Sequence, residues 1–125
     1  MDSRLRQSVR QRAAGRCEYC ALRQEQEPLA FHVEHITPRS HGGKDALENL
    51  ALACQHRNLH KGTNLSGLDP QTGELTRLFH PRLDNWNEHF TRQGGEIIGK
   101  SAIGRTSVRL LRMNEGGRRE LRGGV

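Results

Sequence analysis

The sequence predicts a small α+β fold in a single domain, and three observations lead to this prediction. The chain has 125 residues, which is enough for one compact domain and too short for two ordinary ones. Apolar residues recur at helical spacing near both ends, whereas the middle contains short apolar runs that are typical of strands. Only 33% of the residues are hydrophobic, so the core must be small and is expected to need local reinforcement.

The first expected element is an N-terminal helix over residues 3–14. Apolar side chains recur every fourth residue between Leu5 and Ala13, and arginines occupy the other faces. Asp2 or Ser3 can cap the start of this helix, and Gly15 can end it in the left-handed conformation.

The middle of the chain is expected to form two strands and a short helix. Alternating large side chains predict a strand over residues 31–36, and a polar loop follows at 39–45. A continuous apolar run predicts a buried strand over residues 50–54. One or two helical turns over residues 55–61, ended by Gly62, complete this part.

A second set of small elements is expected in the C-terminal half. In order, these are a turn at 69–73, a strand at 75–79, a helix capped by Asp84 and closed at 94–95, a strand at 97–98 and a helix capped by Ser101. The domain is expected to span residues 1–114. The Gly/Arg-rich tail at 115–125 offers little to bury and is expected to be disordered.

Composition excludes several protein classes. No run approaches the ~20 apolar residues that a membrane-spanning helix requires. The first sixteen residues contain five arginines and no apolar segment, which argues against a secretory signal and predicts a cytoplasmic protein. The three cysteines are therefore expected to be metal ligands or free thiols rather than disulfides.

The distribution of charge suggests a polyanionic partner. The formal net charge is +6, and 17 of the 20 basic residues are arginines, whose guanidinium groups match phosphate geometry. Residues 1–16 carry +4, residues 17–90 carry −3 and residues 91–125 carry +5. This layout suits a protein that holds a polyanion at its two flanks and a cation in its centre.

The most informative stretch covers residues 15–62. It contains, in order, Cys17-x-x-Cys20, Glu34-His35, Gly42-Gly43, Asn49-Leu50, Cys54 and Asn58. In this order and spacing, these pieces resemble the HNH endonuclease family, and the sequence after residue 62 is similar to the extension of a stand-alone bacterial and phage branch. The resemblance implies a ββα-metal (His-Me finger) motif over residues 15–62, followed by a C-terminal hairpin and helix extension over residues 63–114.

The resemblance implies metal-dependent hydrolysis of DNA, most readily double-stranded DNA. His35 is the natural general base because an imidazole titrates near neutral pH. Glu34 and Asn58 offer oxygen ligands to one Mg²⁺-like ion and leave positions for water and phosphate. By resemblance, Asn49 bridges backbone groups in the loop and keeps His35 aimed.

Three basic residues are expected to contact nucleic acid: Arg39, Arg57 and Lys61. His60, which lies beside Lys61, is an alternative phosphate contact. Two alternatives to a DNA-cleaving nuclease remain. An RNA-cleaving nuclease would keep the fold but lacks an aromatic stacking platform, and a zinc-knuckle DNA-binding module would not need Glu34 and His35 opposite Asn58.

Two positions depart from the family pattern. Glu34 stands where the family usually has Asp, and Arg57 stands where many relatives have a fourth cysteine that completes a structural zinc site. Arginine cannot bind zinc. Either Cys17, Cys20 and Cys54 bind zinc with water or His56 as the fourth ligand, or Arg57 pairs with a thiolate and the site holds no metal.

Overall fold

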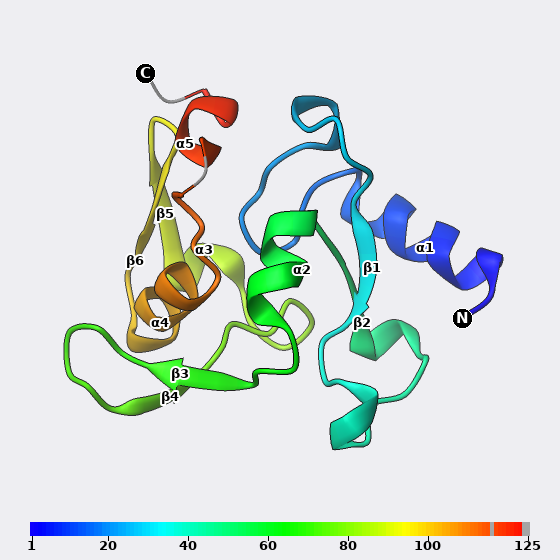
Figure 1. Cartoon of the computed structure of the whole chain (residues 1–125), viewed down its shortest axis with the longest axis horizontal. Helices are drawn as coiled ribbons and strands as arrows, with labels where there is room; N and C mark the ends of the chain where they lie inside the picture. Colours follow the sequence, from blue (N-terminus) through cyan, green and yellow to red (C-terminus); the bar gives the residue numbers. More distant parts are fainter. Residues whose placement is uncertain (116, 124–125) are drawn as a thin grey trace.

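The computed structural model describes residues 1–115 and 117–123. Its helices are α1 (Ser3–Ala13), α2 (Gln55–Lys61), α3 (Trp86–His89), α4 (Ala102–Leu110) and α5 (Arg118–Leu121). Its strands are β1 (His32–His35), β2 (Leu50–Ala53), β3 (Ser66–Leu68), β4 (Leu75–Arg77), β5 (Phe90–Gln93) and β6 (Glu96–Gly99). Strand β1 pairs with β2, β3 with β4 and β5 with β6, each antiparallel, so the described residues hold three two-stranded sheets. The predicted α+β class is confirmed (Figure 1).

The N-terminal helix forms as expected. The side chain of Asp2 caps it by accepting a hydrogen bond from the backbone N–H of Leu5 at 2.8 Å. Val9 is fully buried where α1 packs against β2. The helix ends one residue earlier than expected, because Ala14 already has a left-handed backbone with φ of 53° and its N–H bonds back to carbonyls of the last turn.

The first hairpin and α2 form a ββα unit. In the β1–β2 register, His35 lies opposite Leu50. All four residues of β2 are buried, which explains why this strand reads as a continuous apolar run. Cys54 then precedes α2 as its N-cap residue, and Figure 1 shows α2 in the middle of the molecule, between the N-terminal and C-terminal elements.

The C-terminal elements depart most from the prediction after Asp84. The helix expected there, capped by Asp84 and closed at 94–95, is only the four residues of α3, which Asn85 caps, and Phe90 already begins β5. Trp86 and Phe90 still pack together, with ring centroids 5.1 Å apart, so the helical spacing reflects ring packing across a helix-to-strand junction. The glycines at 94–95 form the turn of the β5–β6 hairpin, and Ser101 caps α4 as predicted.

The tail was expected to be disordered; in its described part, residues 117–123, the structure has helix α5, and residues 116, 124 and 125 lie outside the described part. Helix α5 is held by polar contacts rather than by apolar burial. Arg118 forms an ion pair with Glu27, and Arg122, which is 5% exposed, donates to the carbonyl of Gly95 at 2.7 Å. This segment has few apolar residues to bury, and the contacts of its arginines hold it against the rest of the fold instead.

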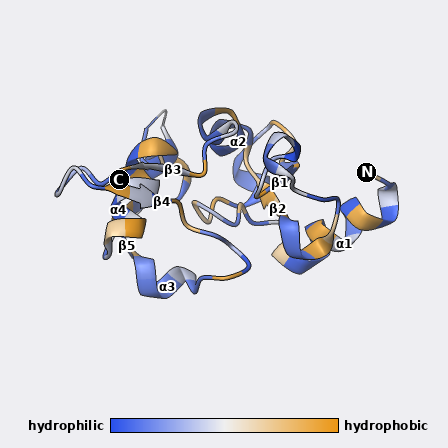
Figure 2. Cartoon of the chain, turned by 90° about the horizontal axis from the view of Figure 1, so that it is seen from below, coloured by the Kyte–Doolittle hydropathy of each residue, from blue (hydrophilic) through white to orange (hydrophobic). Residues whose placement is uncertain are grey.

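One core joins the ββα unit to the C-terminal elements. It combines residues of the N-terminal half, such as Tyr19 and Leu52, with Phe79, Phe90 and Leu111 from the C-terminal half. Figure 2 shows hydrophobic and hydrophilic residues alternating along short elements, as expected for a small core. None of the helices in the described ranges has the length and apolar character needed to cross a bilayer.

Candidate active site

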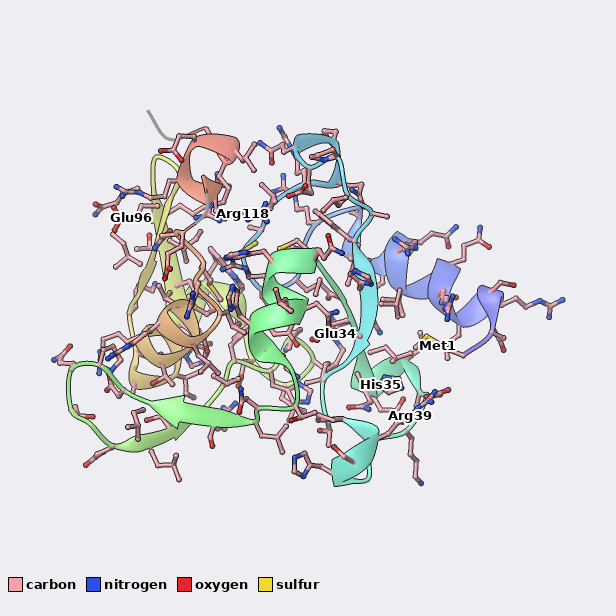
Figure 3. The ribbon with its side chains drawn as sticks, viewed as in Figure 1. Met1, Glu34, His35, Arg39, Glu96 and Arg118 are labelled. Carbon is pink, nitrogen blue, oxygen red and sulfur yellow. The ribbon has the colours of Figure 1, made fainter. Side chains whose placement is uncertain are left out.

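An open, polar cavity of about 600 Å³ lies where β1, α2 and the start of α1 meet. Glu34 and His35 from β1 and Asn58 from α2 line it together, with Arg6 and Arg39 also in its wall. Adjacent strand residues normally point to opposite faces, but β1 ends at His35, and both side chains reach the same cavity. Figure 3 shows Glu34 between α2 and β1, and His35 and Arg39 beyond the lower end of β1, on the side of Met1.

Glu34 is a buried carboxylate in the cavity wall, with only 7% of its surface exposed. The hydroxyl of Tyr19 donates a hydrogen bond to its Oε1 atom. Burial raises the pKa of Glu34, and the positive charge of Lys61 opposes this increase. Its Oε2 atom has no hydrogen-bond partner among the described residues, and neither has the side-chain amide of Asn58. Two hard oxygen donors are therefore available to the cavity.

His35 is held through one ring nitrogen and free at the other. Its Nε2 atom lies 2.6 Å from Oδ1 of Asp45. Asp45 also accepts two hydrogen bonds of 2.8 Å from the guanidinium of Arg39. The Nδ1 atom has no hydrogen-bond partner in the part of the chain that the structure describes. This imidazole can therefore accept a proton from a water molecule in the cavity.

Asn49 closes the loop between the two strands. Its Oδ1 atom accepts a hydrogen bond from the N–H of Thr37 at 2.8 Å, and its Nδ2 atom donates to the carbonyls of Thr37 and Lys44 at 3.0 and 2.9 Å. Gly43 lies directly beneath this bridge, because a Cβ atom there would be 1.7 Å from the carbonyl oxygen of Thr37. The loop that follows His35 is therefore fixed by side chain to backbone contacts.

Residues 17–64 match the family model of the HNH endonuclease. This segment is an HNH endonuclease domain. The match agrees with the motif expected over residues 15–62, and membership in the family implies nuclease activity on nucleic acid with a divalent metal ion. No curated protein and no solved structure matches the chain.

Glu34 and Asn58 are the residues that could hold the divalent ion used by the HNH family. The fit rests on the free oxygen atoms of these two side chains and on the open space beside them, which leaves coordination positions for water and phosphate. Glu34 is one methylene longer than the usual Asp, and the Tyr19 hydroxyl fixes the end of this longer side chain.

A second group of ligands in the HNH domain is built from sulfur. Among the described residues, one set of three or more His, Cys, Asp or Glu side chains could hold a metal: Cys17, Cys20 and Cys54, whose sulfur atoms all lie within 4.8 Å of one another. The Sγ atoms of Cys20 and Cys54 are 3.8 Å apart, about the edge of a tetrahedron with Zn–S bonds of about 2.3 Å. The three thiols are fully buried and fit three corners of a structural zinc site.

Arg57 takes the place of a fourth ligand. It is fully buried, and its three guanidinium nitrogens have no hydrogen-bond partner among the described residues. Hydrogen bonds from Cys17 and Cys54, together with the charge of Arg57, lower the pKa of the Cys20 thiol. His56 is not part of the sulfur cluster, since its ring packs on His60 at a centroid distance of 4.5 Å.

The structure corrects two of the three expected nucleic-acid contacts. Arg57 is buried beside the thiols, and Lys61, which is 2% exposed, donates to the carbonyl of Ile36 at 2.8 Å. Neither side chain can face a nucleic acid in this fold. Arg39 does lie at the cavity, with 63% of its side chain exposed, but it also pairs with Asp45.

Three residues of the site escaped the sequence analysis. Tyr19 lies inside the Cys-x-x-Cys turn, and nothing in its position between two expected zinc ligands indicates its hydrogen bond to Glu34. Asp45 comes two residues after Gly43, where a loop acid has no distinctive spacing. Arg6 appeared only as one member of a basic helix, and its place in the cavity wall depends on how α1 packs against the hairpin.

Proposed function

We propose that this HNH domain hydrolyses phosphodiester bonds of double-stranded DNA, with one divalent metal ion. The observation that carries the proposal is the joint placement of Glu34, His35 and Asn58 in one open polar cavity. Hydrolysis needs a group that takes a proton from water, positive charge near the phosphate and stabilisation of the leaving 3′ oxygen. The cavity supplies a residue suited to each of these tasks.

His35 is the proposed general base. Its Nδ1 atom removes a proton from a water molecule, and the oxygen of that water attacks the phosphorus as the bond to the 3′ oxygen breaks. A divalent ion held by Glu34 and Asn58 would stabilise the charge on the phosphate and on the leaving oxygen. Asn49 keeps the loop after His35 in place, and Arg6 and Arg39 can contact neighbouring phosphates.

The burial of the aromatic side chains favours duplex DNA over single-stranded RNA as the substrate. Sequence-specific RNA recognition relies on exposed rings that stack on unpaired bases. Here Tyr19 and the three phenylalanines are buried, and the half-buried Trp86 donates its indole N–H to the carbonyl of Tyr19 at 2.8 Å. The described surface therefore offers cationic contacts to phosphates rather than a platform for bases.

The proposal is tested by incubating the protein with supercoiled plasmid, linear duplex and single-stranded RNA. Each substrate is combined with Mg²⁺, Mn²⁺, Ni²⁺, Zn²⁺ or chelator, and gel shifts are measured in chelator. We expect DNA cleavage with at least one divalent ion and binding without cleavage in chelator. Preferential RNA cleavage would contradict the substrate, and DNA binding without cleavage in every metal would favour the non-catalytic zinc-knuckle module.

A further inference from the structure

Asp45 is not among the residues that line the cavity, but its side chain contacts two residues that are, His35 and Arg39. Asp45 lies on the loop between β1 and β2, and one oxygen, Oδ1, accepts from both His35 and Arg39. Its other oxygen, Oδ2, accepts from Arg39 at 2.8 Å. The hydrogen bonds from His35 and Arg39 lower the pKa of Asp45, so the group is a carboxylate at neutral pH.

We propose that Asp45 is a positioning residue that fixes the orientation and the tautomer of His35. The inference rests on the proposed function of His35 as general base. An ionised carboxylate can only accept hydrogen bonds, so the imidazole must carry its proton on Nε2. The lone pair is then on Nδ1, which is the nitrogen left free for the water proton.

The same contact acts during the reaction. When Nδ1 takes the proton of the attacking water, the ring becomes an imidazolium with a proton on each nitrogen. Asp45 keeps its own charge and stabilises this cation through the Nε2–H hydrogen bond, as the carboxylate does in the serine protease triad. No proton moves to Asp45.

Asp45 itself is held by three sets of contacts, one of them an ion pair of 3.6 Å between its Oδ2 atom and the N-terminal ammonium of Met1. The guanidinium of Arg39 binds both of its oxygens, which fixes the plane of the carboxylate. The residue before it, Lys44, has its carbonyl bound by Nδ2 of Asn49. The contacts therefore run from Asn49 through the loop backbone to Asp45 and on to His35, which gives a physical route by which Asn49 keeps the base aimed.

The test compares Asp45→Asn and Asp45→Glu with Glu48→Gln. Glu48 is an exposed acid in the same loop, so its substitution changes the charge equally without touching His35. In Asp45→Asn we expect kcat to fall by at least roughly 10–100-fold, the effect of removing a carboxylate that orients a metal-ligating histidine, with KM and duplex affinity unchanged. Asp45→Glu should restore part of kcat, and Glu48→Gln should cleave as the wild type does.

The decisive readout does not depend on cleavage. Nitrogen NMR of His35 in the wild type should show the neutral ring protonated on Nε2, and Asp45→Asn should redistribute the proton between Nδ1 and Nε2. An unchanged tautomer or a wild-type kcat in Asp45→Asn would overturn the role of Asp45. Parallel losses in kcat and melting temperature in Asp45→Asn and Glu48→Gln would show a purely structural role. If the wild type cleaves nothing, the proposed function fails, and the NMR result still judges the His35–Asp45 pair.

Discussion

The oxygen-lined cavity and the sulfur cluster belong to the same HNH domain but are built in opposite ways. At the cavity, Glu34 and Asn58 keep free oxygen atoms beside open space, whereas the three thiols are fully buried and face one another. Neighbouring residues of α2 serve the two sites, since Asn58 lines the cavity and Arg57 lies beside the thiols. A catalytic ion needs an open coordination position and a structural ion does not. The open cavity therefore suits a catalytic ion, and the closed sulfur cluster suits a structural one.

The two sites are nevertheless connected through Tyr19. This residue lies between Cys17 and Cys20, and its hydroxyl donates a hydrogen bond to the cavity carboxylate of Glu34. Its backbone carbonyl accepts the indole N–H of Trp86, which anchors the C-terminal elements to the same turn. The cysteine turn therefore fixes the position of Glu34 in addition to any metal that it binds.

The largest expected effect is on the cavity alone. His35→Ala should reduce cleavage by roughly 10²–10⁴-fold, because it removes the general base, while DNA binding in chelator and thermal stability stay near the wild-type values. The matched control is His41→Ala, which removes an exposed histidine of the neighbouring loop that does not line the cavity. Full turnover by His35→Ala would remove His35 from the mechanism, and equal losses in both variants would point to loop damage.

The next effect concerns the sulfur cluster alone. Arg57→Cys adds a fourth thiol and should raise stability in zinc by about 4 kcal/mol when free zinc is about a thousandfold above its dissociation constant. Thermal unfolding with zinc and with chelator measures this change. Arg57→Ser is the control, since it removes the same charge without adding a ligand. Metal analysis of the untreated wild type shows whether its three thiols already retain zinc. If they do, the stability of Arg57→Cys in zinc should exceed that of the wild type in zinc by less than this amount.

The sequence was a good guide where chemistry depends on neighbours in the chain. Glu34-His35, the loop asparagine and the helix carrying Asn58 were predicted at their observed positions, because the ββα unit is local and its register follows from the apolar run of β2. Burial was predicted less well. Lys61 looks like a surface cation in the sequence, and only the packing of α2 against the end of β1 makes it internal. For Arg57, the sequence left both a nucleic-acid contact and a place beside the thiols open.

A smaller effect is expected from a substitution in the cavity loop, and it tests whether this loop and the sulfur cluster unfold independently. Gly43→Ala forces a methyl group against the carbonyl of Thr37 and the amide of Asn49, so we expect a loss of about 2–4 kcal/mol and of cleavage. Gly42→Ala is the control, since it has open space but a φ of 88°, and it should cost only about 1 kcal/mol. When the two folded variants are treated with an alkylating reagent without denaturant, the buried thiols should not react in either of them. Rapid alkylation in Gly43→Ala would show that the cavity loop and the sulfur cluster unfold together.

The smallest expected effect compares the two basic flanks. Arg6 lies in the cavity wall and has no ion-pair partner among the described residues, whereas Arg119 in α5 pairs with Glu96, and Arg105 and Arg118 pair with Asp69 and Glu27. These three C-terminal arginines are therefore already paired with carboxylates of the same chain. Arg6→Gln should reduce the slope of log affinity against log salt by about 0.9, the value for one lost phosphate contact on duplex DNA, and Arg119→Gln should leave it unchanged. Gel shifts in chelator at several salt concentrations measure both slopes. A lower slope in Arg119→Gln and not in Arg6→Gln would place the DNA on the C-terminal face, away from the cavity wall formed by α1.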